Sequence, residues 1–142
     1  MANIKLNLPK EYMSQLSRLG KRTDEIISKM LVAGGEVVLP EVRSNLQAVI
    51  GRDTKYPSRS TGELVDALGL TPPDVDKKGV HNIKVGFREP RRGGGVNSKI
   101  ANSLEHGKPG QPAKPFLEPA RRKTASKVTQ VMTEVFDREV MR

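Results

Sequence analysis

A loop in which glycine and proline alternate is the feature that most constrains this chain. Proline fixes φ and removes a backbone donor, whereas glycine reaches backbone angles that are closed to other residues. The segment at residues 107–115 can therefore be neither helix nor central strand, and it runs directly into Phe116 and Leu117. We interpret residues 103–120 as a rigid arm that ends in a hydrophobic anchor suited to contact with another surface. The loop residues that set this pattern are Gly107, Pro109, Gly110, Pro112 and Pro115.

The composition predicts a single domain with a lean core and a strongly basic surface. The chain has 142 residues, of which 35% are hydrophobic and 29% are charged. We expect one domain over residues 1–142, either completed by burial in an assembly or carrying long exposed helices. The formal net charge of +9 favours a polyanionic partner such as nucleic acid. Basic residues that only solvate helix faces are an equal alternative.

Several classes of site are excluded by what the sequence lacks. There is no cysteine, which rules out disulfides, zinc–thiolate sites and thiol nucleophiles. No stretch approaches the ~18 apolar residues of a membrane span, so we expect a soluble protein made in the cytoplasm. Neither His81 nor His106 has metal-ligand spacing, and no nucleophile motif is present. We therefore expect no catalytic residue, no cofactor, no metal site and no enzymatic activity.

The N-terminal residues predict a strand followed by a short helix. Residues 3–8 alternate between apolar and polar side chains, which is typical of a half-buried strand. A helix then covers Lys10–Arg22, with Tyr12, Met13, Leu16 and Leu19 at helical spacing, and Gly20 is its stop signal. Residues 1–22 thus form an N-terminal strand and short helix.

A broad apolar stripe from Ile26 to Ile50 predicts a long helix that has to accommodate a proline. The helix begins at Thr23, whose hydroxyl is a candidate cap. Within it the Gly34-Gly35 pair costs about 1 kcal/mol per glycine and Pro40 about 3 kcal/mol. These residues predict a kink near residues 36–40 or two helices in tandem. Because the stripe keeps its phase across Pro40, we favour the kink.

The middle of the chain predicts a polar loop, a brief helix and a β-hairpin. Residues 52–62 lack periodicity, and Ser60 or Thr61 is placed to cap a short helix after them. A hairpin follows across residues 68–87. Its parts are an extended segment whose Pro72-Pro73 confines it to a sheet edge, a turn at Asp76–Gly79, and a strand in which Ile83, Val85 and Phe87 alternate with polar residues or glycine.

A basic loop with three consecutive glycines occupies residues 88–96. Its spacing matches neither a phosphate loop nor a dinucleotide fingerprint, so a mobile tip is the simpler interpretation. The functional alternative is a flexible arginine finger that enters a groove or channel and becomes ordered on assembly. Arg88, Arg91 and Arg92 are the DNA- or channel-facing candidates of this loop.

Two helices flank the glycine–proline loop. The first begins at Asn97 or Ser98, contains Ile100, Ala101 and Leu104, and ends at His106-Gly107. The second carries an apolar stripe from Leu117 to Val140. Basic residues in its early turns oppose the helix dipole, so we assign them to a partner or to a neighbouring acid; they are Arg121, Arg122, Lys123 and Lys127. The whole pattern predicts an α+β fold, with a small antiparallel sheet packed against a long kinked helix and a long C-terminal helix.

Three short motifs, taken in order, resemble those of a known family. They are Arg59-Ser60-Thr61-Gly62-Glu63-Leu64, then Ser103-Leu104-Glu105-His106-Gly107, then Pro112-Ala113-Lys114-Pro115-Phe116-Leu117 with Pro119-Ala120. Together with the helix pair and the hairpin they cover roughly residues 20–140. In this order the chain resembles the neck and tail-completion proteins of tailed bacteriophages, which act in head–tail joining. It departs from their pattern at His106, where an aromatic residue is common, and at Pro40.

The resemblance implies a structural virion protein that forms a ring, sixfold like a tail tube, at the head–tail junction. Such a ring of tail-completion or tail-terminator subunits joins the connector, or head-closure proteins, to the tail tube protein and lets genomic DNA pass. The interface candidates are Thr61, Gly62, Leu64, Leu104, Glu105, His106, Gly107, Pro112, Ala113, Lys114, Pro115, Phe116 and Leu117, with the loops at 88–96 and 107–115 as mobile or interface segments. The alternative is a non-enzymatic, basic nucleic-acid-binding domain that uses Arg88, Arg91, Arg92, Arg121, Arg122 and Lys123.

Overall fold

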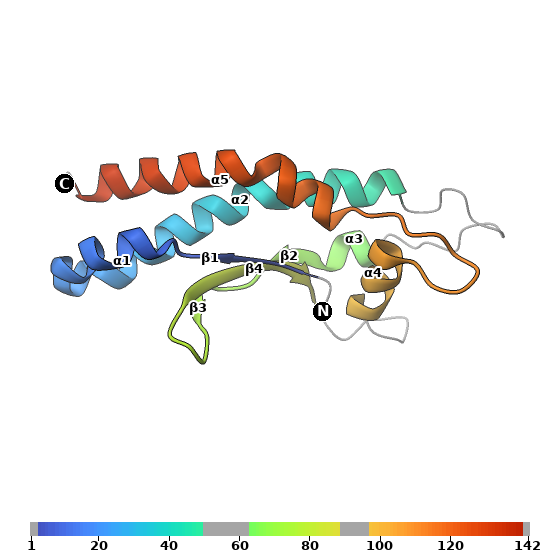
Figure 1. Ribbon diagram of the computed structural model, residues 1–142, viewed down its shortest axis with the longest axis horizontal. Coiled ribbons are helices and arrows are strands. Elements are labelled where there is room, and N and C mark those ends of the chain that lie inside the picture. The colour runs from blue at the N-terminus through green and yellow to red at the C-terminus, as the bar shows by residue number, and fades with distance from the viewer. Residues whose placement is uncertain (1–2, 50–62, 89–96, 141–142) are drawn as a thin grey trace.

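Two long helices pack against each other over one face of a small antiparallel sheet (Figure 1). The computed structural model describes residues 3–49, 63–88 and 97–140, and over these residues the predicted α+β class is confirmed. The elements are β1 (Ile4–Asn7), α1 (Lys10–Leu16), the 3-10 helix η1 (Ser17–Arg22), α2 (Thr23–Val49), α3 (Glu63–Ala67), β2 (Leu68–Leu70), β3 (Asp74–Val75), β4 (His81–Phe87), α4 (Asn97–His106) and α5 (Leu117–Val140).

Strand β4 is the centre of the sheet. It pairs antiparallel with β1 on one side and with β2 and β3 on the other. The segment with Pro72-Pro73 therefore lies at an edge, as predicted, because proline cannot donate to a second neighbour. The predicted turn is confirmed as well: Gly79 has φ 81°, and its N–H donates to the Asp76 carbonyl at 3.0 Å.

The sheet has one apolar face and one polar face. The register places Ile4 opposite Val85 and Leu6 opposite Ile83, and alternation directs these side chains to the same side of the sheet. Ile4, Ile83 and Val85 are buried in the core, with Leu6 packed against it, on the side where α2 lies. The residues between them are polar and face the other way, where Lys5 stands opposite Lys84.

The helix predicted over Lys10–Arg22 is divided in the structure: α1 ends at Leu16, and the 3-10 helix η1 continues to Arg22. Gly20, the predicted stop, interrupts η1 with φ 61°. The next helix begins at Thr23 as expected. Its hydroxyl does not cap that helix, however, because it donates backward to the Leu16 carbonyl at 2.5 Å. Tyr12 is fixed by its ring against Phe136, 4.8 Å between centroids, and by its hydroxyl at 2.6 Å from Thr133 Oγ1.

Helix α2 runs unbroken from Thr23 to Val49 with Pro40 inside it. The alternative of two helices in tandem is therefore wrong, while the kink at 36–40 stays a prediction. Pro40 and Glu36 are both exposed, so the Glu36 carbonyl that loses its helical donor can turn to water.

The glycine pair in α2 has a packing reason. A Cβ on Gly34 would lie 2.7 Å from Met132 Cε, and one on Gly35 would lie 2.7 Å from Leu70 Cδ2. The two glycines thus let α2 approach α5 on one side and the sheet on the other.

Helix α5 runs antiparallel to α2 and buries one stripe against it (Figure 1). The stripe follows the predicted positions except at its end, where Glu139 is buried and Val140 is 36% exposed. After Met132 and Val135/Phe136 the helical period reaches 139 rather than 140. Met13 and Ile100, also assigned to apolar stripes, are similarly exposed.

Candidate interaction surface at the α4–α5 junction

The α4–α5 junction, defined as residues 104–118, turns the chain from the last turn of α4 into the first turn of α5. Gly107 makes the turn with φ 79°, and its N–H donates to the Ser103 carbonyl at 2.8 Å. This is the predicted glycine stop of α4. A Cβ at Gly107 would lie 2.8 Å from the Ala113 backbone nitrogen. Glycine is therefore required here both for its backbone angle and for the close return of the loop.

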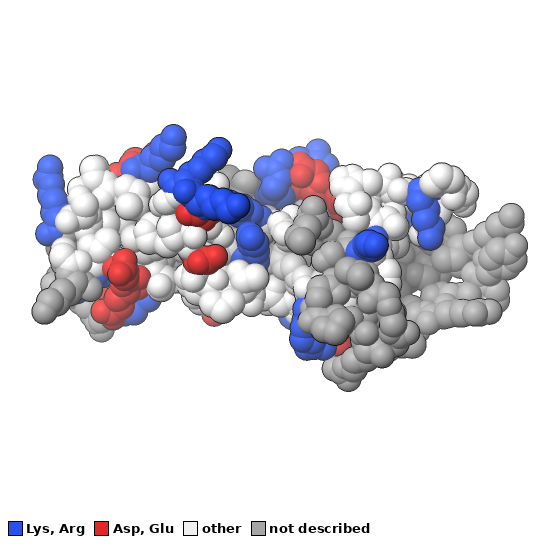
Figure 2. Space-filling model, turned by 90° about the horizontal axis from the view of Figure 1, so that it is seen from below, with Lys and Arg blue, Asp and Glu red and all other residues white. Residues whose placement is uncertain are grey.

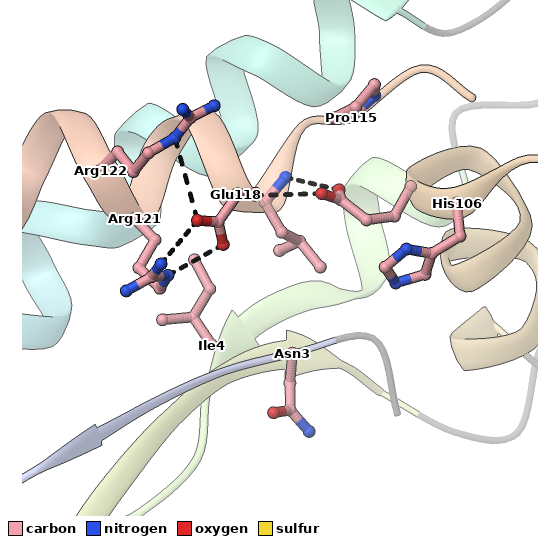
Figure 3. Close-up of a pocket in the computed structure, with 9 residues that line it drawn as sticks. Asn3, Ile4, His106, Pro115, Glu118, Arg121 and Arg122 are labelled. Carbon is pink, nitrogen blue, oxygen red and sulfur yellow. Dashed lines mark hydrogen bonds and ion pairs between the residues drawn. The ribbon is translucent and has the colours of Figure 1, made fainter.

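The carboxylate of Glu105 caps the first turn of α5 (Figure 3). Its Oε1 accepts the N–H groups of Phe116 at 2.8 Å and Leu117 at 2.7 Å, and its Oε2 accepts that of Glu118 at 3.1 Å. An anion at a helix N-terminus is stabilised by the dipole as well as by these bonds. The side chain of one helix thus completes the start of the next.

Phe116 lies in the core of its own chain. Its side chain is 0% exposed, and its ring meets Phe87 edge-on at 6.1 Å between centroids. Its carbonyl accepts the Asn45 side-chain amide at 3.2 Å. The hydrophobic anchor at the end of the arm therefore holds α5 onto the sheet and α2, and it is not presented to another surface in this chain.

The loop between the two helices is held internally but keeps an exposed outer side. Lys108 and Gln111 exchange backbone hydrogen bonds of 3.0 and 2.8 Å around Gly110, and the Lys114 N–H donates to the Leu104 carbonyl at 2.7 Å. The side chains of Pro112, Ala113 and Pro115 are exposed. Figure 1 shows this loop projecting at one end of the molecule.

The predicted interface residues divide by exposure. Leu64, Glu105, Phe116 and Leu117 are buried, whereas Leu104, Gly107 and Lys114 are partly buried and His106, Pro112, Ala113 and Pro115 are exposed. Thr61 and Gly62 lie outside the described residues, as do Arg91 and Arg92 of the basic loop. Arg88 is described and exposed, at the end of β4. The structure thus brings the 104–117 candidates together and leaves an accessible subset at the loop.

A pocket of about 420 Å³ lies beside the junction (Figure 3). Arg121 binds Glu118 through two hydrogen bonds, of 2.9 Å from Nε and 2.5 Å from Nη2, and Arg122 Nε lies 3.9 Å from the same carboxylate. The hydrogen bond from Arg121 lowers the pKa of Glu118 and raises that of Arg121 itself. The lining residues are Asn3, Ile4, Glu105, His106, Pro115, Leu117, Glu118, Arg121 and Arg122.

The basic residues in the early turns of α5 have acidic neighbours within the chain. Besides the two arginines on Glu118, Lys123 Nζ lies 2.9 Å from Glu41 Oε1 on α2. The neighbouring-acid alternative therefore accounts for these three residues. Lys127 is exposed, and no described residue forms an ion pair with it.

Sequence reasoning missed the capping role of Glu105. Local capping rules look for a polar side chain directly before the helix, and the residue there is Phe116. A long helix that begins after an apolar residue signals that its first N–H groups need an acceptor from elsewhere in the chain. The sequence therefore indicates that an acceptor is needed. It does not indicate which residue supplies it, because Glu105 is eleven residues upstream of Phe116.

No cluster of three or more metal-ligating side chains occurs within residues 3–49, 63–88 and 97–140. Over the same residues, no helix has the length and apolar character needed to cross a bilayer. The described junction itself is built of hydrogen bonds, ion pairs and an exposed proline-rich loop.

Comparison with known protein families identifies the chain at this point. The model of the family described as "Bacteriophage HK97-gp10, putative tail-component" matches residues 10–107, more than half of the 142 residues. The chain belongs to this HK97-gp10-like family. It is thus a bacteriophage tail component, as the resemblance of the sequence motifs predicted.

The HK97-gp10-like match covers the long helix, the hairpin and α4, and it ends at Gly107. The Glu105-His106-Gly107 motif is inside it, whereas the proline loop and α5 are outside. The assignment of residues 112–120 to the family pattern therefore stays a prediction. Searches of curated proteins and of solved structures returned no match.

Proposed function

We propose that this chain is a non-enzymatic structural subunit that forms a ring at the head–tail junction of a tailed bacteriophage. The ring joins the connector, or head-closure proteins, to the tail tube, and genomic DNA passes through it. Membership of the tail-component family is the observation that carries this proposal. In this role the protein is made in the host cytoplasm and resides in the virion.

The α4–α5 junction supports a role in assembly. A closed ring built from one kind of subunit needs two different patches on each copy. The exposed loop side chains Pro112, Ala113 and Pro115 offer one such patch, because the loop behind them is already ordered by Glu105 and Gly107. A preorganised loop loses little conformational entropy on binding. We therefore assign this loop surface, together with His106, to the contact between neighbouring copies.

The stoichiometry and position of the ring follow from the proposed role. A subunit that terminates a sixfold tail tube matches it best as a hexamer. The exposed loop lies at one end of the molecule, beyond the N-terminus of α5 (Figure 1), so adjacent copies would meet end to side. The single domain of residues 1–142 would be the repeating unit.

The proposal is tested by changing the loop surface without touching the supports beneath it. In the double variant Pro112→Glu/Ala113→Glu we expect a folded monomer with wild-type melting that no longer forms rings on purified tails. Gln15→Glu/Ser17→Glu, on the exposed side of α1 and η1, is the control and should assemble normally. Electron microscopy of tails mixed with each protein is the measurement. Wild-type protein that never decorates tails or connectors would refute the ring.

A further inference from the structure

The polar face of the sheet is left uncovered by the helical layers. Alternation along β4 places Asn82, Lys84 and Gly86 on this face and extends to Arg88. Asn82 is buried, Lys84 and Gly86 are partly buried, and Arg88 is exposed. Lys5 of β1 stands directly opposite Lys84. Figure 3 shows Ile4, the first residue of β1, pointing toward α5, and Asn3, the residue before it, pointing away. The view from below in Figure 2 shows Lys and Arg side chains on this side, with Asp and Glu side chains between them.

The charges on this face are mostly unmatched. Like charges directly opposite each other on a sheet destabilise it. Among the described residues of this face only Lys5 forms an ion pair, with Asp76 Oδ2 at 3.0 Å. Within the described part of the chain, Lys84 and Arg88 form no ion pair, and neither do Lys77 and Lys78 in the adjoining turn. The helical side differs, because Arg121, Arg122 and Lys123 are each matched by Glu118 or Glu41.

Two shallow hollows place cations beside exposed backbone. One, of about 240 Å³, is lined by Arg88 and Asp66 together with Gly69 and Gly86. The other, of about 320 Å³, is lined by Lys84 and Asp74 together with Thr71 and Asn82. Gly69 and Gly86 are direct partners in the sheet. The space beside Gly69 is open, whereas the Asn3 side chain lies beside Gly86. Both hollows are open, and among the described residues neither cation forms an ion pair with the carboxylate in its hollow, so each cation remains available to an anionic group.

We propose that this face, carrying Lys5, Lys84 and Arg88 with Lys77 and Lys78 at its margin, contacts the phosphate backbone of duplex DNA. The inference rests on the proposed ring. In that ring we place the polar face of each sheet toward the channel and the α2–α5 layer outward. Lys84 and Arg88 are four residues apart on an extended strand, about 13 Å. Duplex DNA carries one charge per ~1.7 Å of axis, so both cations meet phosphates at once.

The side chains on this face favour contact with the DNA phosphate backbone and not recognition of a base sequence. The described face carries no aromatic side chain for stacking on bases, since Phe87 alternates to the apolar side. It also presents no helix to a major groove. Contacts to phosphates alone position a duplex without specifying sequence, which suits DNA that has to slide past. An acidic protein surface is the competing occupant.

The test measures the salt dependence of duplex binding by the full-length protein. Each phosphate contact contributes about 0.9 to the slope of log affinity against log salt. In Lys84→Gln/Arg88→Gln we expect the slope to fall by about 1.8. The control is Arg18→Gln/Lys127→Gln, which removes the same charge from exposed residues of η1 and α5 that form no ion pair with a described residue. Its slope should equal that of the wild type.

Three outcomes would overturn the inference: equal loss of slope in both double variants, salt-independent wild-type binding, or tighter binding of wild type to polyglutamate than to DNA. Ring formation on tails is scored separately for each protein. Rings that form normally while the two DNA slopes stay equal would reject the DNA face and leave the proposed function standing. Selective loss of slope in protein that never forms rings would reject the proposed function and retain the DNA-binding face.

Discussion

Two buried glutamates stand near the opposite ends of α5, and they are accommodated by different chemistry. Glu105 lies at the N-terminus of the helix, where three backbone N–H groups bind its carboxylate. Glu139 lies in the last turn and is met by Lys29 Nζ at 3.2 Å and Arg22 Nη2 at 3.8 Å. Arg138 Nε is 3.9 Å from it as well. Both side chains are almost fully buried.

The helix dipole explains the difference. A carboxylate at a helix N-terminus is favoured by the partial positive charge of the free N–H groups, whereas one in the last turn meets partial negative charge. Glu105 is therefore satisfied by the backbone, while Glu139 has side-chain cations from α2, η1 and its own turn. The first arrangement depends on loop geometry, and the second depends on titratable groups. Variants at the Glu105 site and at the Glu139 site test this distinction.

Glu105→Ala should have the largest effect. It leaves three N–H groups without their acceptor in a buried site, each worth about 1–3 kcal/mol, so we expect at least about 3 kcal/mol of lost stability. Urea denaturation followed by circular dichroism is the measurement. Asp137→Ala, on the exposed side of α5, is the control and should stay within about 0.5 kcal/mol of the wild type. A loss below about 1 kcal/mol for Glu105→Ala would mean that water replaces the cap.

Gly107→Ala should come next, because the position of Glu105 depends on this turn. The substitution places a side chain at φ 79° and within 2.8 Å of the Ala113 nitrogen, so we expect about 2–4 kcal/mol from strain and displaced backbone. Gly110→Ala is a matched control, with φ 81° and open space around a Cβ. It should cost about 1–2 kcal/mol for the backbone angle alone. Equal losses in the two variants, measured by urea denaturation, would show that the close return of the loop does not matter.

Glu139→Gln should cost less than either, about 1–2 kcal/mol. The amide oxygen still accepts from Lys29, and the cations that lose their counter-charge are more than a third exposed and can be hydrated. Lys29→Met/Arg22→Met should destabilise the fold more than Glu139→Gln. The double variant leaves the buried Glu139 carboxylate without these two cations at the helix end that disfavours negative charge. Thermal melting at neutral pH ranks the two. The opposite order would indicate that the cations, not the carboxylate, need the pairing.

The smallest effect is a pH dependence at the Glu139 end. Hydrogen bonds to Glu25 and then to Glu139 raise the pKa of Lys29 above its ordinary 10.5. A raised folded-state pKa stabilises the fold fully below the unfolded value, and this stabilisation is lost as pH rises through the folded value. The free energy of unfolding should therefore decline above pH 10.5, and less so in Glu25→Gln. An identical decline in wild type and Glu25→Gln would contradict this assignment.

Local patterns were enough to predict most of the elements. Alternation gave β1 and β4, glycine and proline gave the turns at Gly79 and Gly107, and the apolar stripe gave α2. These features are encoded within a few residues of where they act. The ends of stripes were less certain, since Glu139 took the buried position expected for Val140.

The parts that sequence reasoning could not supply are contacts between distant residues. Whether Phe116 faced its own core or a neighbour depended on Phe87 and Asn45, which lie in other elements. The unmatched charge of the open face likewise depended on the register that sets Lys5 opposite Lys84. Contacts between distant residues are decided by tertiary packing, and the periodicity of the sequence does not predict them.

The cap on α5 has a consequence for chain continuity. The bonds from Glu105 and the buried stripe of α5 hold the last helix in place without help from the covalent link through Gly110, where a Cβ would meet open space. We expect a chain nicked between Gly110 and Gln111 to remain associated, and the two fragments to find each other when mixed. New ends placed there would make this loop a junction for circular permutation, or an insertion point for a reporter peptide.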